Sequence, residues 1–150
     1  MKSIILFFTL MGLLFAEIKV GDTFPKLNLV NQYNIPTQIK TKGSSTLILS
    51  FEKDVSSEVK NYLDTKEKGF LEANSMMYIS DISTMPSLIT RMFALPKMKK
   101  FSFQVSLIYD ENAAASIPRH KNQVTVIELQ NNQVKKIDFS RGEELESLLK

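Results

Sequence analysis

The sequence predicts a single α/β domain with a central mixed sheet, an N-terminal β-hairpin and flanking helices, for three reasons. Between residues 46 and 109, short apolar runs alternate with stretches of helical spacing, which is typical of parallel strands joined by helices. Near the carboxyl terminus, two adjacent asparagines separate a pair of strand-like runs, which indicates a hairpin. The chain has 150 residues, enough to bury one sizeable core without disulfides.

The amino terminus has the pattern of a secretory signal peptide. A lysine precedes a mostly apolar stretch over residues 4–14, and the small residue Ala16 follows before a polar break. The apolar stretch is shorter than the roughly 18 to 20 residues that span a bilayer. We therefore expect residues 1–16 to be a signal peptide cleaved after Ala16, residues 17–150 to be the domain, and the mature protein to be periplasmic. An uncleaved, membrane-anchored form is the alternative.

The domain is predicted to begin with the hairpin and a central strand. The alternating runs Leu27–Val30 and Thr37–Ile39 flank turn-forming residues. The apolar run Thr46–Phe51 is typical of a strand that is buried on both faces. Residues Ser56–Phe70 have helical spacing, and Asp54 or Ser56 is available to cap this helix. Strand and helix together predict the first β-α-β unit.

The alternation continues through the middle of the chain. Ser75–Ser80 and Phe103–Tyr109 are predicted to be buried strands, and Thr84–Leu95 a helix that ends before Pro96. Three successive alanines within Asn112–Ser116 allow a short further helix.

A hairpin and a helix are predicted to close the domain. Val124–Leu129 and Val134–Phe139 are joined by Asn131 and Asn132, a pair that favours a tight hairpin turn. Ser140–Glu143 matches a capping box, and leucines at helical spacing follow it.

Two segments, Val20–Pro25 and Leu47–Phe51, resemble the opening of exported thioredoxin-like and peroxiredoxin-like domains and the strand that leads to their active site. A closer resemblance is to the YtfJ-type family of exported, cysteine-free thioredoxin-like proteins. The segments that carry it are Ile79–Ile82, Lys99–Lys100 before a strand that ends at Tyr109 and Asp110, Val124–Leu129, and Ser140–Glu143. The resemblance implies a thioredoxin-like fold and export, but no defined reaction.

The chain contains no cysteine, although thioredoxin-like relatives are best known for cysteine chemistry. In the redox relatives the strand is followed by a Cys-x-x-Cys or by one reactive cysteine, and an ungapped comparison places Ser56 and Val59 at the two cysteine positions. These relatives also carry a cis-proline directly before the final hairpin, where Asn122 and Gln123 stand in this chain. We therefore expect a redox-inactive protein, without thiol–disulfide oxidoreductase or peroxidase activity.

Non-covalent binding is the main functional prediction. The resemblance implies a binding face where active relatives hold their substrates, at Asp54, Val55, Ser57, Asn122 and Gln123. The protein is accordingly predicted to be a binding or accessory module of the cell envelope, with an unidentified envelope protein or peptide as its partner. No cofactor is expected, because no Gly-rich phosphate loop follows a strand.

Two alternatives assign chemistry to other side chains. Met85, Met92 and Met98, with His120, could supply thioether and imidazole ligands and make the protein a Cu(I) carrier. Ser56 could be a nucleophile with His120 as its base, although no Gly-x-Ser-x-Gly elbow surrounds this serine. Methionine more often fills gaps in a core, and no carboxylate lies near His120 in the sequence to orient its ring, so both alternatives rank below binding.

Basic residues suggest a separate contact surface. Lys97, Lys99 and Lys100 are interleaved with phenylalanines, a pattern that suits anionic lipid headgroups or an acidic partner and equally suits an ordinary helix-to-strand connection. The formal net charge is only +3, and the lysines are scattered among carboxylates, so no nucleic-acid partner is expected.

Three aspartates, Asp54, Asp81 and Asp110, each follow a predicted strand. The carboxyl ends of parallel strands are a common place for ligands in α/β folds, but aspartate also begins turns and helices there. A hard-cation site would require the three carboxylates to converge.

Overall fold

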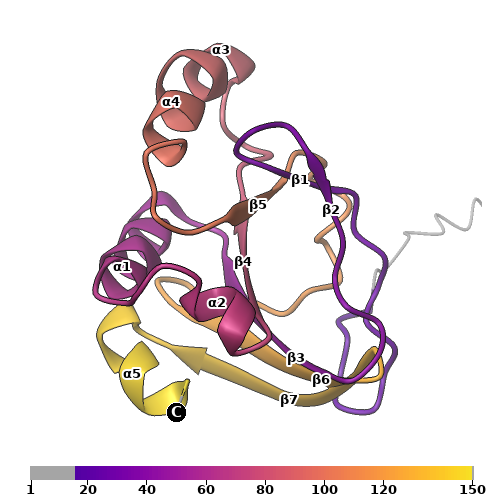
Figure 1. Cartoon of the computed structure of the whole chain (residues 1–150). Helices are drawn as coiled ribbons and strands as arrows, with labels where there is room; N and C mark the ends of the chain where they lie inside the picture. Colours follow the sequence, from indigo (N-terminus) through magenta and orange to yellow (C-terminus); the bar gives the residue numbers. More distant parts are fainter. Residues whose placement is uncertain (1–15, 150) are drawn as a thin grey trace, which may run out of the picture.

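A computed structural model describes residues 16–149 as one mixed seven-stranded sheet with all of its helices on one side (Figure 1). The strands are β1 Leu29–Asn31, β2 Pro36–Thr37, β3 Ser44–Ser50, β4 Met76–Asp81, β5 Val105–Ile108, β6 Val124–Gln130 and β7 Gln133–Ser140. Their order in the sheet is β2-β1-β5-β4-β3-β6-β7, with β3, β4 and β5 parallel. The predicted parallel centre and both predicted hairpins are confirmed. Apart from Ala16, the expected signal peptide lies outside the described residues.

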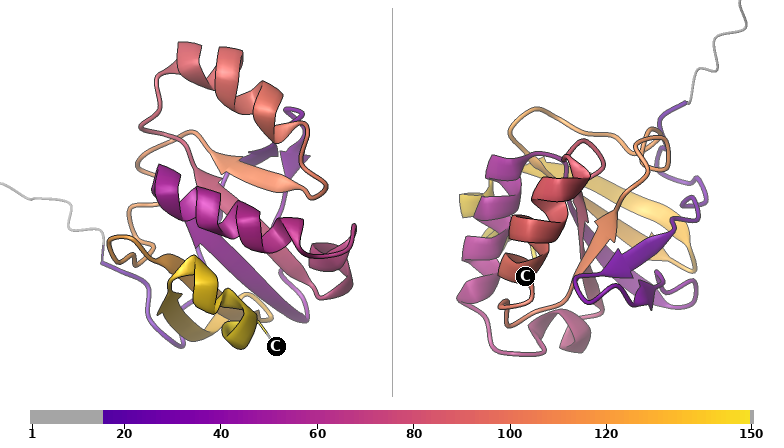
Figure 2. Two further views of the ribbon diagram at one scale, coloured as in Figure 1. Left: turned by 90° about the vertical axis from the view of Figure 1, so that its left-hand side faces the viewer. Right: turned by 90° about the horizontal axis from the view of Figure 1, so that it is seen from above.

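The helical segments are α1 Lys53–Asp64, α2 Phe70–Ala73, α3 Ser87–Ile89, the π-helical η1 Thr90–Ala94, α4 Leu95–Met98, the 3₁₀ segment η2 Gly142–Glu144 and α5 Leu145–Leu148. The segments α3, η1 and α4 follow one another without a break, and we call this continuous stretch, Ser87–Met98, the outer helix. It lies at the rim of the molecule (Figure 2). Within residues 16–149, no helix is long and apolar enough to cross a membrane.

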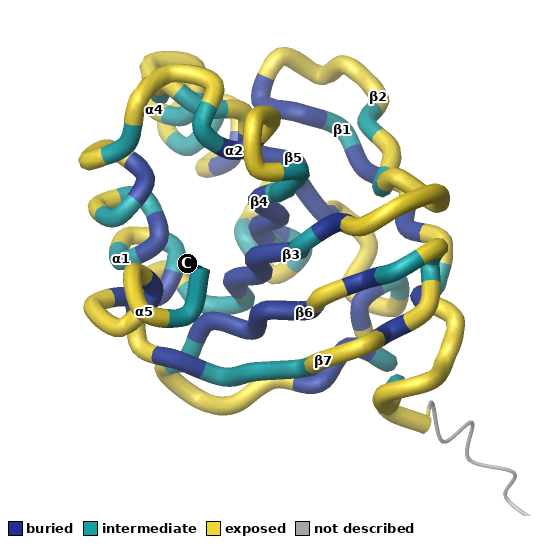
Figure 3. The backbone as a smooth tube through the Cα atoms, turned by 60° about the horizontal axis from the view of Figure 1, so that its bottom comes forward, coloured by how far each residue is buried: buried dark blue, intermediate teal, exposed yellow. Residues whose placement is uncertain are grey.

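The sheet separates two apolar clusters. The helical-face cluster includes Val55 and Val59 of α1, which pack with Ile48 of β3 and Leu145 of α5. The cluster on the other face is covered by segments without regular structure, whose buried residues are Phe24, Leu27, Ala114 and Ile117. Buried positions are concentrated in the central strands β3, β4, β5 and β6 (Figure 3).

Two predicted features of the middle segments are wrong. The helix predicted to stop before Pro96 continues to Met98. Proline normally ends a helix because it lacks an N–H and its ring clashes with the carbonyl four residues back. Here the π-helical turn precedes Pro96, and the Leu95 N–H donates to Thr90 O, five residues back. The helix predicted at Asn112–Ser116 is instead a series of turns whose hydrogen bonds span only three residues.

The predicted helix caps are also wrong. Helix α1 begins at Lys53, so Asp54 and Ser56 lie inside its first turns rather than before them. At the other end of the chain, Ser140 Oγ donates to the Arg141 carbonyl, and the N–H of Gly142 donates to Glu58 Oε2 of α1 at 2.7 Å. A distant carboxylate thus takes the role expected of the local capping box. The hairpin turn is confirmed, with positive φ at both asparagines, 50° and 62°.

Candidate functional site

The start of α1 and the loop before β6 meet at the carboxyl edge of the parallel strands. We call residues Pro118–Gln123 the edge loop. Strands β3 and β4 end at this edge, and β6 begins there, because Leu49 pairs with Thr125. In open α/β sheets this edge is where ligand-binding loops gather.

Ser56 belongs to an interior cluster of four hydroxyl groups. Its Oγ lies 2.8 Å from Ser50 Oγ and 3.3 Å from Ser80 Oγ, and it donates to the Glu52 carbonyl at 3.0 Å. The phenol oxygen of Tyr78 lies 2.9 Å from Ser50 Oγ. Ser50 and Ser80 are paired in the register of β3 and β4, so the parallel pairing itself builds the cluster. Ser56 is thereby committed to hydrogen bonds beneath α1.

The hydroxyl cluster has no group that could serve as a base. Burial raises the pKa of Tyr78 above its usual value of 10.0, although hydrogen bonds from neighbouring serines oppose this, so the phenol stays neutral. The His120 ring stacks on Phe139, with ring centroids 3.7 Å apart. No hydrogen bond joins Ser56 to His120 within the described part of the chain. The acyl-transfer pair is therefore not assembled, since a serine nucleophile needs an adjacent base.

The second cysteine position, Val59, and the residues of the predicted binding face divide between core and surface. Val59 is fully buried on the side of α1 that faces the sheet. Because α1 starts earlier than predicted, Val55 lies one turn before Val59 on that same side and is buried as well. Val55 therefore cannot contact a partner, which corrects its inclusion in the binding face. The remaining residues reach solvent at the edge: Asp54, Ser57 and Asn122 are exposed, and Gln123 is half-buried.

The edge loop is attached to the body through its backbone. The N–H of Asn122 donates to Glu52 Oε1 at 2.8 Å, and the N–H of Gln123 donates to the His120 carbonyl at 3.2 Å. Thr125 Oγ1 donates to the Pro118 carbonyl at 3.0 Å. Every peptide bond among residues 16–149 is trans, and Asn122 has a φ of 60°. The loop is thus held in one conformation without a cis-proline.

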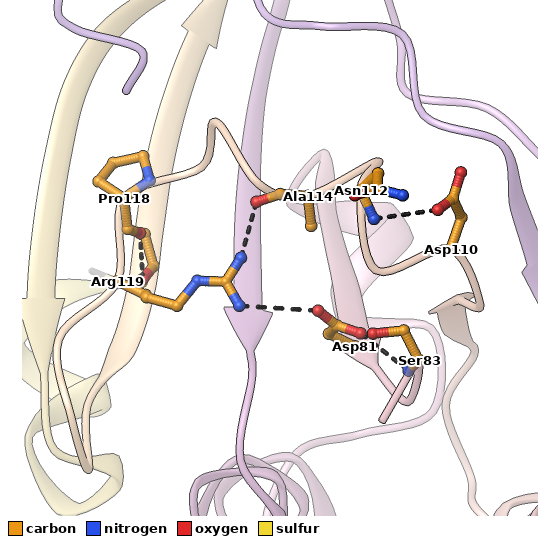
Figure 4. A network of polar contacts seen from close by, with 8 residues as sticks. Asp81, Ser83, Asp110, Asn112, Ala114, Pro118 and Arg119 are labelled. Carbon is orange, nitrogen blue, oxygen red and sulfur yellow. Dashed lines mark hydrogen bonds and ion pairs between the residues drawn. The ribbon is translucent and has the colours of Figure 1, made fainter. Parts of the chain in front are cut away.

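Arg119 is the centre of a second attachment (Figure 4). Its Nη2 donates to the Ala114 carbonyl at 2.7 Å, and its Nη1 lies 3.8 Å from Asp81 Oδ2 at the end of β4. The guanidinium also lies over the Phe51 ring, 3.8 Å from the centroid. The Asp81 side chain is largely buried, and its Oδ1 accepts the Ser83 N–H at 2.9 Å. Arg119 therefore connects the edge loop to the ends of both β3 and β4.

The predicted Cu(I) ligands do not come together. Met85 and Met98 pack against the helical-face cluster, and Met92 is exposed on the outer helix. His120 lies on the other face of the sheet, where it stacks on Phe139. The sheet thus separates the imidazole from the two packed thioethers.

The aspartates do not form a cation site either. Asp110 Oδ1 accepts the N–H of Asn112 at 3.0 Å in a local turn, while Asp81 faces Arg119 (Figure 4). In the chain from residue 16 to residue 149, no group of three or more His, Cys, Asp or Glu side chains is arranged to hold a metal ion.

A shallow hollow of about 260 Å³ adjoins the edge loop on the face without helices. Its lining residues are Glu17, Ile18, Lys19, Pro118, Arg119, His120, Ile137 and Phe139. The sequence does not reveal this hollow or the Glu52 attachment, because both join segments far apart in the chain. The hydroxyl cluster had a local signal, since Ser50 and Ser80 are polar residues at the ends of otherwise apolar runs.

Comparisons with known proteins identify the fold. No protein-family model and no curated protein matches the sequence. Solved structures do: a peroxiredoxin-like protein from Aquifex aeolicus is 14% identical with a TM-score of 0.56, covering 89% of this chain and 86% of that one. Peroxidoxin BcpB from Mycobacterium tuberculosis is 13% identical with a TM-score of 0.58, and coverage is 89% and 94%. The thioredoxin domain of a thiol-disulfide oxidoreductase from Bacteroides vulgatus is 10% identical with a TM-score of 0.58, and coverage is 89% and 100%.

The chain has a thioredoxin-like fold, as predicted. At such low identity the likeness establishes the fold alone. This chain has no thiol with which to carry out thiol–disulfide exchange, since it contains no cysteine.

Proposed function

We propose that this thioredoxin-like domain is a redox-inactive binding module of the cell envelope, which holds a protein or peptide non-covalently at the carboxyl edge of its sheet. The observation that carries the proposal is the fixed edge loop. Glu52 holds its backbone at Asn122, and Arg119 fastens it to the ends of β3 and β4. A surface that is already ordered loses little conformational entropy on binding, so it favours affinity without covalent chemistry.

The backbone contacts of the loop favour recognition through side chains. The N–H groups of Asn122 and Gln123 already donate within the chain, so a peptide strand could accept from them only by displacing Glu52 or the His120 carbonyl. Asp54 and Ser57 reach solvent from α1, and the hollow beside His120 offers an aromatic wall. Because α1 and the hollow lie on opposite faces of the sheet, we expect a partner that crosses the carboxyl edge. It would place polar groups on Asp54 and Ser57 and a side chain in the hollow.

Photocrosslinking in cells tests the binding face. A photoreactive benzoylphenylalanine at Ser57 and, separately, at Asn122 should capture the same partner, because the proposal assigns both positions to one binding surface. Lys42 is the matched control, since it is exposed before β3 at the opposite end of the sheet. Crosslinking patterns at Ser57 and Asn122 that equal the pattern at Lys42 would refute the proposal.

The envelope location is proposed from the amino-terminal sequence pattern. A mature protein that begins at Glu17 is expected in the periplasmic fraction. Mass spectrometry of the purified protein checks this, and recovery of the full-length chain from the cytoplasm would contradict it.

A further inference from the structure

The outer helix presents large apolar side chains to solvent. They occupy two neighbouring positions and the same two positions one turn later, so they share one side of the helix. These residues are Leu88, Ile89, Met92 and Phe93, whose exposed fractions are 63%, 44%, 59% and 63%. A cluster of this kind on a soluble domain marks an interaction surface.

The π-helical turn holds these side chains on the outside. Because Leu95 donates to Thr90 O across five residues, Thr90 and Leu95 fall on the same side of the helix. Thr90 is buried there, and Leu95 and Met98 pack against the helical-face cluster. Beyond this, the segments of the outer helix contact mainly one another, and the helix stands at the rim of the molecule (Figure 2). The opposite, apolar side is therefore left without a partner in the body of the domain.

The charge of this region is uniform. Between Asp81 and Asp110 the chain has no acidic residue and four basic ones. The basic residues are Arg91, Lys97, Lys99 and Lys100, all of them exposed. Within residues 16–149, none of these four side chains takes part in an ion pair. Tyr33 Oη donates to the Lys99 carbonyl at 3.1 Å, which places the exposed side chain of Tyr33, in the β1–β2 turn, beside the same lysines.

We propose that the outer helix and the lysines at its end dock the domain on bilayers that contain anionic lipid. Apolar side chains on one side of a helix can enter the boundary between headgroups and acyl chains, while flanking basic residues contact anionic headgroups. A bilayer suits this surface because the apolar side chains project from the rim of the molecule. Of the phenylalanines that are interleaved with these lysines in the sequence, only Phe93 faces solvent. Phe101 and Phe103 pack against the helical-face cluster. This docking is independent of the binding proposed at the edge loop.

A single-tryptophan variant tests the proposal directly, because the chain has no tryptophan of its own. Phe93→Trp places the fluorophore on the docking surface. Its emission should shift to shorter wavelength with vesicles of phosphatidylglycerol and phosphatidylcholine in equal parts, and the shift should reverse in high salt. Pure phosphatidylcholine vesicles should leave it unchanged. Val20→Trp is the control, since Val20 is also 63% exposed but lies beside β7, at the other edge of the sheet, and should not shift.

Charge reversal tests the basic part of the surface. A variant with Lys97, Lys99 and Lys100 all changed to Glu should lose roughly 100-fold or more in vesicle affinity. The same reversal at Lys26, Lys40 and Lys42, which are exposed elsewhere, changes the net charge equally and should retain most of the affinity.

Three results would overturn the docking proposal. The first is no spectral shift of the Phe93→Trp protein with anionic vesicles. The second is equal loss of affinity in both charge-reversal variants. The third is a shift of the Phe93→Trp emission to shorter wavelength on self-association, or on binding of an acidic peptide, when anionic vesicles cause no such shift. Circular dichroism of each variant confirms that the fold is retained.

Discussion

The edge loop and the outer helix both face solvent, but they are held to the body in opposite ways. Hydrogen bonds and a stacked guanidinium fix the edge loop, through Glu52 and Arg119, and its exposed side chains are polar. Apolar packing of Leu95 and Met98 holds the outer helix, whose other side is exposed and apolar. Hydrogen bonds require defined directions, whereas apolar contacts do not. The loop is thus suited to selective recognition of a partner, and the outer helix is suited to contact with the surface of a lipid bilayer.

The largest effect is expected where Gly142, after β7, packs against α1. A Cβ on Gly142 would overlap Glu58 Cβ of α1, and the N–H of Gly142 is held by the same glutamate. Gly142→Ala should therefore push α1 from its place and lower the free energy of unfolding by about 3 kcal/mol. Urea denaturation measures this. Glu143→Ala, at an exposed neighbouring position, should change it by less than about 0.5 kcal/mol. Equal stability of the two variants would show that α1 is not fixed in this way.

The attachment of the edge loop can be broken at Arg119. Arg119→Ala removes the hydrogen bond to Ala114 and the contact over Phe51, and it leaves the largely buried Asp81 without its cation. We expect a loss of about 2 kcal/mol in the free energy of unfolding. Amide exchange at Asn122 should become faster, while exchange in the outer helix stays unchanged.

Lys121→Ala is the control for this substitution, because Lys121 is an exposed residue of the same loop. It should alter neither stability nor exchange. Faster exchange in the outer helix of the Arg119→Ala protein would mean that the two regions are coupled, contrary to the comparison.

The hydroxyl cluster beneath α1 gives a smaller, pH-dependent effect. Burial raises the pKa of Tyr78 above its usual value of 10.0, so the unfolded chain releases this proton at lower pH than the folded protein. The stability linked to Tyr78 is therefore complete below about pH 10 and falls as pH rises toward the folded-state pKa. Tyr78→Phe should cost about 1 kcal/mol at neutral pH, since Ser50 loses a hydrogen-bond partner, but should flatten the alkaline decline.

Thermal unfolding midpoints from about pH 7 to about pH 11 check the behaviour of Tyr78. Tyr33→Phe, which changes an exposed tyrosine, should keep the wild-type decline. An equally steep decline in Tyr78→Phe would indicate that another group causes it.

Local patterns were sufficient for most elements of this fold. The buried run of β3 and the Asn131–Asn132 turn depend on residues that are adjacent in the chain, and both were predicted. The helix through Pro96 was not, because a π-helical turn has no signal in apolar spacing.

The candidate site was predicted less well because its contacts are long-range. Glu58 takes the place of the capping box by accepting from Gly142, 84 positions away, and Glu52 accepts from Asn122 across 70 positions. Val55 was misplaced because α1 starts earlier than predicted, which brings Val55 into the helix on the same buried side as Val59. Residue types near the edge could be predicted, whereas their exposure and partners depended on packing.

The smallest change in stability is expected for substitutions on the exposed side of the outer helix, and it tests whether that side packs on the domain. The double variant Leu88→Ser and Met92→Ser should alter the free energy of unfolding by less than about 0.5 kcal/mol, because both side chains already face solvent. Leu95→Ser, on the packed side of the same helix, should cost about 2 kcal/mol. Urea denaturation of the two proteins compares the sides. A double variant as unstable as Leu95→Ser would mean that its side chains pack on the body, and the contrast with the edge loop would fail. A neutral double variant that no longer binds anionic vesicles would show that these apolar residues serve an external surface rather than the fold.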